Sequence, residues 1–304
     1  MPPSPVVVPL AKKSTNGRFL PTLLRLQFRL LGRLAPQASD RRAASLFLTP
    51  RRRRFPEPGT PGLSTQRLTL SSDGFPLAVW SWGEGPAVVL AHGWSGHAGQ
   101  MSSFIRPLAD AGFRVLAFDQ PAHSRSGGRR TTLLKMAAAL KAIARTTGPL
   151  HAVVAHSLGA TAATLALFDN LPAQRAVLLA PPAEAPSFAR RLSQLLGLSE
   201  ERTKGMLAEV QRQVGVHLAS LDLRLVSAWV RQPALIFHDV ADRDVPFAHG
   251  RDIAEAWPAA RLAPLSGLGH YRLLSDPEVV RSTVAFLREG LAAATPRPSL
   301  ATSG

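Results

Sequence analysis

The stretch Val153-Val154-Ala155-His156-Ser157-Leu158-Gly159-Ala160 determines how the rest of this chain is interpreted. An apolar run ends abruptly at Ser157, which has a small residue two positions away on each side, and an Ala-rich segment with helical spacing follows. The pattern predicts a buried strand, a sharp turn and a helix, with the serine hydroxyl pushed out above a sheet. Small residues suit such a turn because strand and helix crowd together around it. The alternative is an ordinary strand-to-helix junction in which the serine is only a helix N-cap.

Length and composition fit one large α/β unit. The 304 residues are 45% hydrophobic, which is enough for a single large core. The sequence contains no Cys, which excludes disulfides and thiolate metal sites and is consistent with a cytoplasmic location. No apolar run reaches the roughly 18 residues that a membrane-spanning helix needs. No uninterrupted apolar segment follows Lys12 and Lys13, so we do not expect a secretory signal.

The positive charge is concentrated near the N-terminus. The formal net charge is +16, and residues 1–60 hold 12 Lys and Arg against Asp40 and Glu57, a net of +10. The remaining 244 residues hold 24 basic and 18 acidic side chains, a net of +6. A basic arm can bind nucleic acid or anionic lipid, but the excess of 31 Arg over 5 Lys favours a general compositional bias. Nucleic acid is therefore not a favoured partner.

Residues 1–60 are predicted to form an arm separate from a domain at 61–304. Residues 1–17 are Pro-rich and polar, and we expect them to be disordered. Residues 19–34 predict an amphipathic helix, with arginines four residues apart at Arg25, Arg29 and Arg33. We expect the apolar face of this helix to pack on its own domain, although a peripheral membrane contact is the alternative. The four arginines at 51–54 either bind an anion or form a solvated turn.

From Thr65 onward the sequence alternates between strand and helix patterns. Residues 66–70 and 77–82 predict a hairpin around Ser72-Asp73-Gly74. Further strands are predicted at 87–91, 114–118, 152–155, 176–180, 234–237 and 261–265, and helices at about 101–111, 131–146, 158–169, 247–256 and 277–293. Strands that are almost continuously apolar are buried on both faces. The fold class is therefore α/β, with a mainly parallel eight-stranded sheet between helices.

Residues 183–230 interrupt this alternation. They contain no strand pattern and predict short helices, such as 187–196 and 200–214. An insertion between the sixth and seventh strands lies over the carboxyl ends of the sheet, where open α/β sheets bind ligands. We expect a helical lid rather than a separate domain.

Two further stretches, together with an acidic residue considered below, could complete a nucleophilic site around Ser157. In His92-Gly93-Trp94-Ser95-Gly96, after the strand at 87–91, the backbone N–H of Trp94 together with that of Leu158 would form an oxyanion hole. The alternative is a plain turn with a hydrogen-bonded His92. In Gly267-Leu268-Gly269-His270-Tyr271, His270 follows the eighth strand and could take the serine proton.

The acid of such a site is expected after the seventh strand. Asp242 is favoured there, because Val-Pro a few residues later marks the start of the next helix. Asp239 and Asp244 compete for the role, and Glu184 after the sixth strand is a weaker rival. Other histidines, such as His151, His217 and His249, are expected to be bystanders. The histidines have no metal-ligand spacing, so we expect no metal and no cofactor.

The order nucleophile, acid, base along the chain is that of the α/β-hydrolase superfamily. The chain resembles this superfamily over about residues 65–293, through HGWSG (92–96), FDQPAHSRS (118–126), AHSLG (155–159), DRDVP (242–246) and GLGHYRLL (267–274). The resemblance implies a nucleophile elbow at Ser157, although Ala155 replaces its usual first Gly. It also implies a structural loop at His123 and Ser124, where Ser124 replaces a usual Gly. Each motif alone is moderately specific, but the five together in this order are strong evidence.

The resemblance implies a serine hydrolase that cleaves a carboxylic ester or thioester through an acyl-enzyme, with the triad Ser157, Asp242 and His270. Relatives that use Asp at the elbow, such as dehalogenases and epoxide hydrolases, are excluded. Trp94, Met101 and Phe104 are predicted to bind an apolar part of the substrate. The open alternatives are an acyltransferase with the same triad and a non-catalytic binding protein on the hydrolase scaffold.

Overall fold

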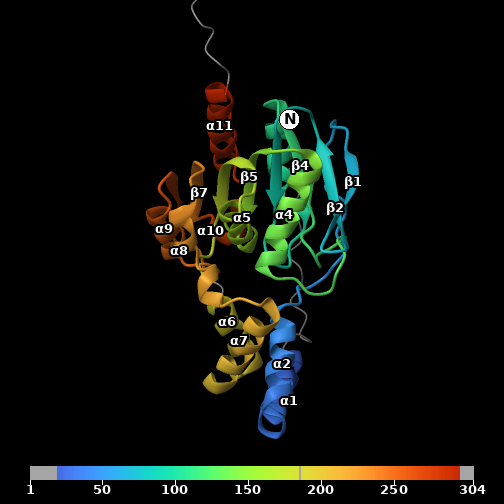
Figure 1. The fold of residues 1–304 in the computed structure, drawn as a ribbon, viewed down its shortest axis with the longest axis vertical. Helices are drawn as coiled ribbons and strands as arrows, with labels where there is room; N and C mark the ends of the chain where they lie inside the picture. The colour runs from blue at the N-terminus through green and yellow to red at the C-terminus, as the bar shows by residue number, and fades with distance from the viewer. Residues whose placement is uncertain (1–18, 185, 295–304) are drawn as a thin grey trace, which may run out of the picture.

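The computed structural model describes residues 19–184 and 186–294 (Figure 1). Its centre is an eight-stranded sheet with strand order β1-β2-β4-β3-β5-β6-β7-β8. The strands are β1 (Gln66–Ser72), β2 (Phe75–Trp82), β3 (Ala87–Ala91), β4 (Arg114–Phe118), β5 (Leu150–His156), β6 (Ala173–Leu179), β7 (Ala234–Asp239) and β8 (Ala260–Leu265). Strand β2 pairs antiparallel with β1 and β4, and every other pairing is parallel. The predicted fold class is confirmed.

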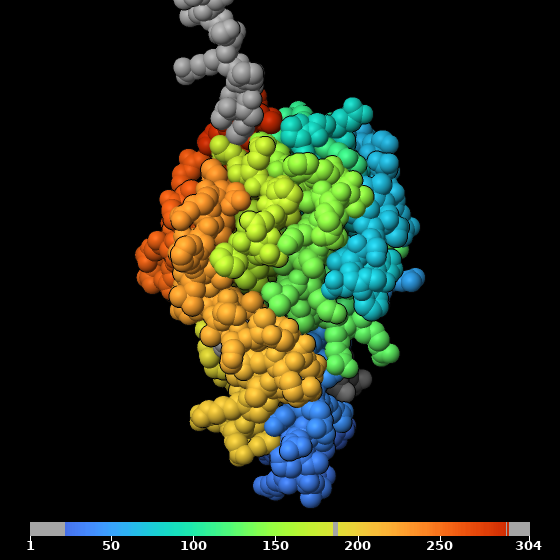
Figure 2. All heavy atoms as spheres, in the orientation of Figure 1, coloured from blue at the N-terminus to red at the C-terminus, as the bar shows by residue number. Residues whose placement is uncertain are grey.

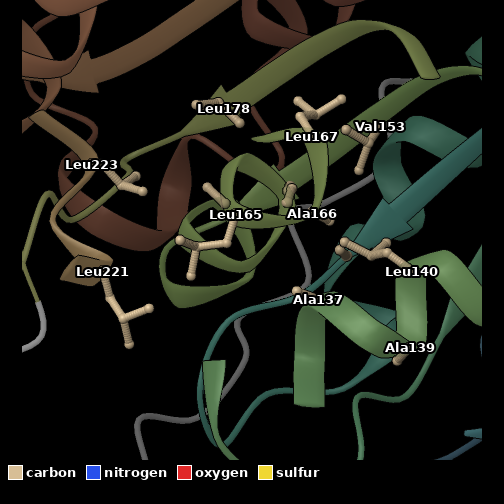
Figure 3. Packing of buried hydrophobic residues seen from close by; sticks show 14 of the residues in the cluster. Ala137, Ala139, Leu140, Val153, Leu165, Ala166, Leu167, Leu178, Leu221 and Leu223 are labelled. Atoms are coloured by element: carbon tan, nitrogen blue, oxygen red, sulfur yellow. The ribbon is translucent and has the colours of Figure 1, made fainter. Parts of the chain in front are cut away.

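Two apolar layers cover the sheet because neighbouring side chains of a strand point to opposite faces. In β5, Val153 and Ala155 belong to one core cluster, and Ala152 and Val154 belong to the other. The first cluster includes residues of α4 (Leu133–Thr147), α5 (Leu158–Phe168) and α9 (Phe247–Ala256). The second includes α3 (Ser102–Asp110) and α11 (Pro277–Ala294). Figure 3 shows part of the first layer, to which α4 contributes Leu140, α5 contributes Leu167 and β5 contributes Val153.

The chain between β6 and β7 is helical, as the sequence predicts. It contains α6 (Pro186–Leu196), α7 (Glu200–Val214), the short turns η3 (Leu218–Leu221) and η4 (Ser227–Trp229), and α8 (Leu223–Val226). Ser199 caps the N-terminus of α7, because its side chain accepts a hydrogen bond from the backbone N–H of Arg202, and Gly215 in the left-handed conformation caps its C-terminus. The remaining short elements are η2 (Ala98–Met101) and α10 (Gly269–Arg272).

The N-terminal helices α1 (Phe19–Leu34) and α2 (Pro36–Phe47) pack beside this insertion. Contacts join α2 to α7 and α1 to α6, and Figure 1 shows the four helices together at one end of the molecule, away from the sheet. We call α1, α2, α6 and α7 the helical cap. The ion pair between Arg202 and Asp40, 2.9 Å and largely shielded from solvent, joins α7 to α2. The Pro-rich segment 1–17, predicted to be disordered, lies outside the described residues.

No helix in the described ranges is long and apolar enough to cross a membrane.

Candidate active site

Ser157 occupies a strained turn between β5 and α5. Its backbone has φ 52° and ψ −129°, in the left-handed half of conformational space that residues with a side chain rarely adopt. The strain persists because the chain on both sides is fixed by the sheet and the helix. Gly159 allows this packing, since a Cβ atom there would lie 2.3 Å from the carbonyl oxygen of His92. The predicted strand, turn and helix are therefore present, and the fully buried Ala155 is accommodated in β5.

The three predicted triad residues come together at the carboxyl ends of the parallel strands. Ser157 follows β5, Asp242 follows β7 and His270 follows β8. The Oγ of Ser157 lies 3.0 Å from Nε2 of His270, and Nδ1 of His270 lies 2.8 Å from Oδ2 of Asp242. All three residues are buried. With a proton on Nδ1, the ring donates to the carboxylate and accepts the hydrogen bond from the serine hydroxyl.

Asp242 is arranged to stay ionised. Burial opposes the charge, but the hydrogen bond with His270 and backbone N–H groups outweigh it, so the pKa of Asp242 lies below its ordinary value. The donors are the N–H of Asp244 at 2.8 Å and that of Val245 at 3.0 Å, both to Oδ1. Oδ1 is thus used by the loop, and Oδ2 is left for the histidine.

The rival acids have other partners. Asp239 accepts hydrogen bonds from the backbone N–H groups of Ala241 and Leu268, so it ties the β7 loop to the loop that carries His270. Asp244 pairs with Arg191, and Glu184 pairs with Arg190. Neither Asp239 nor Asp244 has a hydrogen bond to His270 among the contacts of the described residues.

The predicted oxyanion turn lies directly against the elbow. A Cβ atom on Gly93 would lie 2.9 Å from the Cβ of Ser157, so only glycine permits this approach. Within the described chain, the backbone N–H groups of Trp94 and Leu158 donate to no protein acceptor. Both residues line the same cavity. These N–H groups are available to a ligand oxygen beside Ser157.

An apolar cavity of about 370 Å³ opens at this point, between the sheet and the helical cap. Trp94, Ser95 and Leu158 form its floor next to the elbow. The remaining walls come from α2 and the chain after it, the start of α4, α6, α7 and η3, and they include Phe47, Leu133, Phe188, Leu192, Val210, Val214 and Leu218. Pockets of this size and lining typically hold small organic ligands.

Comparisons with known proteins identify the family of this chain. A model of the alpha/beta hydrolase family matches residues 88–283. The chain belongs to this family. It is 23% identical over 256 residues to the AB hydrolase superfamily protein YisY of Bacillus subtilis (strain 168), covering 69% of this chain and 94% of that protein.

Solved structures of esterases share the fold. The Pyrococcus furiosus esterase Pf2001 is 20% identical, with a TM-score of 0.61 over 78% of this chain and 98% of that one. Est1E from Butyrivibrio proteoclasticus, solved with bound ferulic acid, is 17% identical, with a TM-score of 0.59 over 74% of this chain and 98% of that one. At these identities the likeness establishes the fold alone.

Two buried histidines hold the loops of this site in place. Sequence reasoning did not assign either of them to the site. His156 precedes Ser157, and its Nε2 donates to the carbonyl oxygen of His270 at 2.9 Å, while the two rings lie 4.7 Å apart. Burial and repulsion from His270 lower the pKa of His156 to about 3, so its ring is neutral at ordinary pH. This hydrogen bond ties the end of β5 to the loop that carries His270. Its only sequence signal is its position next to the elbow serine.

A second support holds the oxyanion turn. Nε2 of His123 accepts a hydrogen bond from the backbone N–H of Ser95 at 2.9 Å, and burial lowers the pKa of His123 to about 4. Asp119 accepts from the backbone N–H groups of Ala98 and Arg125. In this structure the loop at His123 and Ser124 therefore anchors the oxyanion turn. His92 is hydrogen-bonded through both ring nitrogens, to Gly93 and Gln120.

The prediction for Met101 and Phe104 needs correction. Both side chains are fully buried with Ile105 and Leu108 in the core layer under α3, and neither lines the cavity. Helix α3 packs on the face of the sheet opposite α4 and α5, whereas the cavity lies above the strand ends. Of the predicted substrate-binding residues, only Trp94 lines the cavity.

The arginine cluster at 51–54 has a structural role at one position. The Arg52 side chain donates to the carbonyl oxygens of Ser124, Ser126 and Gly128, which fastens the segment after α2 to the structural loop. Among the predicted bystanders, His151 bonds the carbonyl of Leu287 and His249 accepts from the N–H of Ala183. The described residues contain no group of three or more His, Asp or Glu side chains suited to a metal ion.

Proposed function

We propose that this protein is a serine hydrolase that cleaves a carboxylic ester or thioester through an acyl-enzyme. One observation carries the proposal: the hydrogen-bonded series Asp242, His270, Ser157 ends beside Trp94 and Leu158, which line an apolar cavity and whose backbone N–H groups have no acceptor among the described residues. A serine alcohol is a weak nucleophile until a neighbouring base takes its proton. The arrangement supplies that base, a carboxylate that orients it, and donors for a developing negative charge.

In the acylation step, Oγ of Ser157 attacks the substrate carbonyl carbon and its proton moves to Nε2 of His270. The carbonyl oxygen becomes an oxyanion, which accepts hydrogen bonds from the N–H groups of Trp94 and Leu158. The ester or thioester bond then breaks, and the imidazolium gives its proton to the leaving alcohol or thiol. The acyl group is now joined to Oγ of Ser157.

In the deacylation step, water replaces the departed alcohol or thiol. Nε2 of His270 takes a proton from the water as its oxygen attacks the acyl carbon. The bond to Oγ breaks, Ser157 regains its proton from His270, and the carboxylic acid leaves. Asp242 stays ionised throughout and stabilises the imidazolium in both steps.

The cavity favours a substrate with an apolar acyl or alcohol part. Its walls are mostly Leu, Val and Phe side chains, and apolar surface gains about 25 cal/mol for each Å² removed from water. Two structural relatives support an ester substrate. The Pyrococcus furiosus protein Pf2001 is named an esterase, and Est1E was solved with ferulic acid bound. We expect hydrolysis rates to rise with acyl length until the cavity is full.

The test is hydrolysis of p-nitrophenyl acetate, butyrate, octanoate and palmitate by the wild type and by Ser157→Ala. Removing the nucleophile is expected to lower kcat on the order of 10⁶-fold. The matched control is Ser102→Ala, because among the described residues the Ser102 hydroxyl bonds only the carbonyl of Gly99, and its loss is expected to leave kcat/KM unchanged. Equal activity of wild type and Ser157→Ala would refute the proposal. Adding an alcohol to the assay separates hydrolysis, which yields free acid, from acyl transfer, which yields a new ester.

A further inference from the structure

Helix α1 has apolar side chains on two opposite faces. On the inner face, Phe28 is only 2% exposed and Leu24 packs on the core. On the outer face, spacings of three and four residues align Leu23, Leu26, Leu30 and Leu34 in one row, which we call the leucine stripe. The inner face accounts for the packing of α1 on its own protein, as the sequence predicts. The leucine stripe has no such explanation.

The leucine stripe is open to solvent. Leu26 is 62% exposed, Leu30 is 58% exposed, and Leu23 and Leu34 are likewise more than half exposed. Four large exposed side chains in a continuous row differ from scattered surface leucines, which are common on any protein. Contiguous apolar patches of this kind mark sites of protein or membrane interaction.

Positive charge accompanies the stripe. Helix α1 contains Arg25, Arg29 and Arg33 and no acidic residue. Arg25 is exposed but donates to the carbonyl oxygen of Leu195 in α6, which helps dock α1 on α6. Arg29 and Arg33 are exposed beside the stripe, and within the described chain neither forms an ion pair. Their charge is therefore not neutralised by a described neighbour.

The location of α1 suits a flat partner. Figures 1 and 2 show the N-terminal helices, α1 beside α2, at the tip of the molecule that lies away from the sheet. The four cap helices carry ten basic and four acidic side chains, a net charge of +6. A bilayer surface with anionic headgroups offers both of the chemistries that α1 presents, an apolar layer for leucine and negative charge for arginine.

Two other partners fit less well. Nucleic acid would pair with Arg29 and Arg33 but would leave the leucine stripe in water. A second copy of this chain packed stripe against stripe would bring unneutralised arginines of the same sign together. Anionic lipid offers an apolar layer to the leucines and negative charge to the arginines on the same side of the helix.

We propose that α1 docks this protein on anionic membranes, with the leucine stripe inserted at the level of the headgroups and Arg29 and Arg33 bound to lipid phosphate. Helices α2, α6 and α7 of the same cap line the cavity. Docking through α1 therefore brings the helices that line the apolar cavity near lipid. This inference does not depend on the catalytic role of Ser157.

The test is flotation of the full-length protein with vesicles of phosphatidylcholine alone or with about 30% phosphatidylglycerol. We expect binding to the anionic vesicles that weakens as salt is raised. Leu26→Gln/Leu30→Gln is expected to weaken binding at least about tenfold, because each leucine loses its apolar insertion. Arg29→Gln/Arg33→Gln is expected to weaken binding to anionic vesicles on the order of tenfold, with no effect on neutral ones.

The control is Leu225→Gln/Phe168→Gln, which removes two equally exposed apolar side chains far from α1 and is expected to bind like the wild type. All substituted side chains are exposed, and matching circular dichroism and Tm verify that each variant folds. The proposal is overturned if the wild type stays unbound with anionic vesicles, or if the leucine variant binds as well as the control. It is also overturned if sedimentation shows a dimer that only the leucine substitutions dissociate, with no vesicle binding.

Discussion

The two carboxylate oxygens of Asp242 have different hydrogen-bond partners. Oδ1 accepts two backbone N–H groups of its own loop, and Oδ2 accepts the hydrogen bond from His270. We predict that Asp242→Asn lowers kcat by about 10⁴-fold, because an amide neither holds the productive tautomer nor stabilises the imidazolium. The measurement is the steady-state hydrolysis of a p-nitrophenyl ester.

Asp244→Asn is the matched control, two residues away in the same loop. Its carboxylate pairs with Arg191 at 2.9 Å in an exposed ion pair, and such pairs contribute little. We expect a change in kcat of no more than a few fold. Larger loss in Asp244→Asn than in Asp242→Asn would reassign the acid.

At this scale the sequence identifies residues whose role follows from a local pattern. Ser157, Asp242 and His270 each follow a strand, so their meeting at one sheet edge could be predicted. The role of His156 could not be assigned in this way, and the resemblance places His123 only in a structural loop, because their contacts depend on a carbonyl and an N–H group brought close by the fold. A buried histidine looks the same in sequence whatever its partner is.

The packing of α5 against the end of β3 sets the geometry of the elbow. A Cβ on Gly159 would lie 2.3 Å from the His92 carbonyl oxygen and 2.9 Å from that of Ala91. These carbonyl oxygens belong to the backbone and cannot shift without disturbing β3. We therefore predict that Gly159→Ala lowers the free energy of unfolding by about 1–3 kcal/mol and also lowers kcat. Urea unfolding measures the first effect. The control is Gly59→Ala, where the added methyl meets nothing within 4 Å and stability is expected to be unchanged.

Helix α7 sets one wall of the cavity. Val214 lines it near the end of the helix, so Val214→Trp adds bulk to the space for a substrate chain. We predict a shift in chain-length preference, with octanoate and palmitate losing about tenfold or more in kcat/KM while acetate is little affected. Leu225→Trp, an exposed position outside the cavity, is the control. A uniform loss for all esters would contradict the assigned binding mode.

Elements are more predictable than their packing. The strand and helix bounds follow from apolar runs, which agree with the structure to within a few residues. The periodicity of 101–111 identifies a buried face that includes Met101 and Phe104, but it does not say which side of the sheet that face covers. Helix α3 covers the side away from the cavity, so both residues serve the core.

At the scale of the whole molecule, buried neutral histidines link stability to pH. The pKa values of His123 and His156 fall from an ordinary 6.5 to about 4 and about 3, chiefly through burial. Between about pH 6.5 and pH 4 the unfolded chain binds more protons than the folded one, so stability falls as pH falls. At about pH 5 we predict a loss of roughly 2 kcal/mol for each histidine relative to neutral pH.

His123→Gln tests this assignment. Glutamine keeps an acceptor for the Ser95 N–H but does not titrate, so the slope of unfolding free energy between about pH 7 and pH 5 is expected to be shallower than in the wild type. The exposed His217→Gln is the control and is expected to keep the wild-type slope. An unchanged slope in His123→Gln would show that His123 is not the group responsible.

The arrangement of the helical cap lies beyond what local sequence patterns reveal. Residues 46–51 of the arm and residues 210–221 of the insertion are far apart in the chain, yet both line the cavity. Their contact depends on side chains such as Asp40 and Arg202, which are 162 positions apart. No local periodicity encodes such a pairing, and the sequence alone treats the arm as separate from the site.

The central claim is that Ser157 forms a covalent acyl-enzyme, and labelling with a fluorophosphonate probe tests it most directly. We predict one adduct per wild-type molecule by intact mass spectrometry, located on Ser157 by peptide mapping and prevented by prior heat unfolding. Ser157→Ala is expected to remain unlabelled although it folds. A well-folded wild type that takes no label, or an adduct on another residue, would contradict the claim.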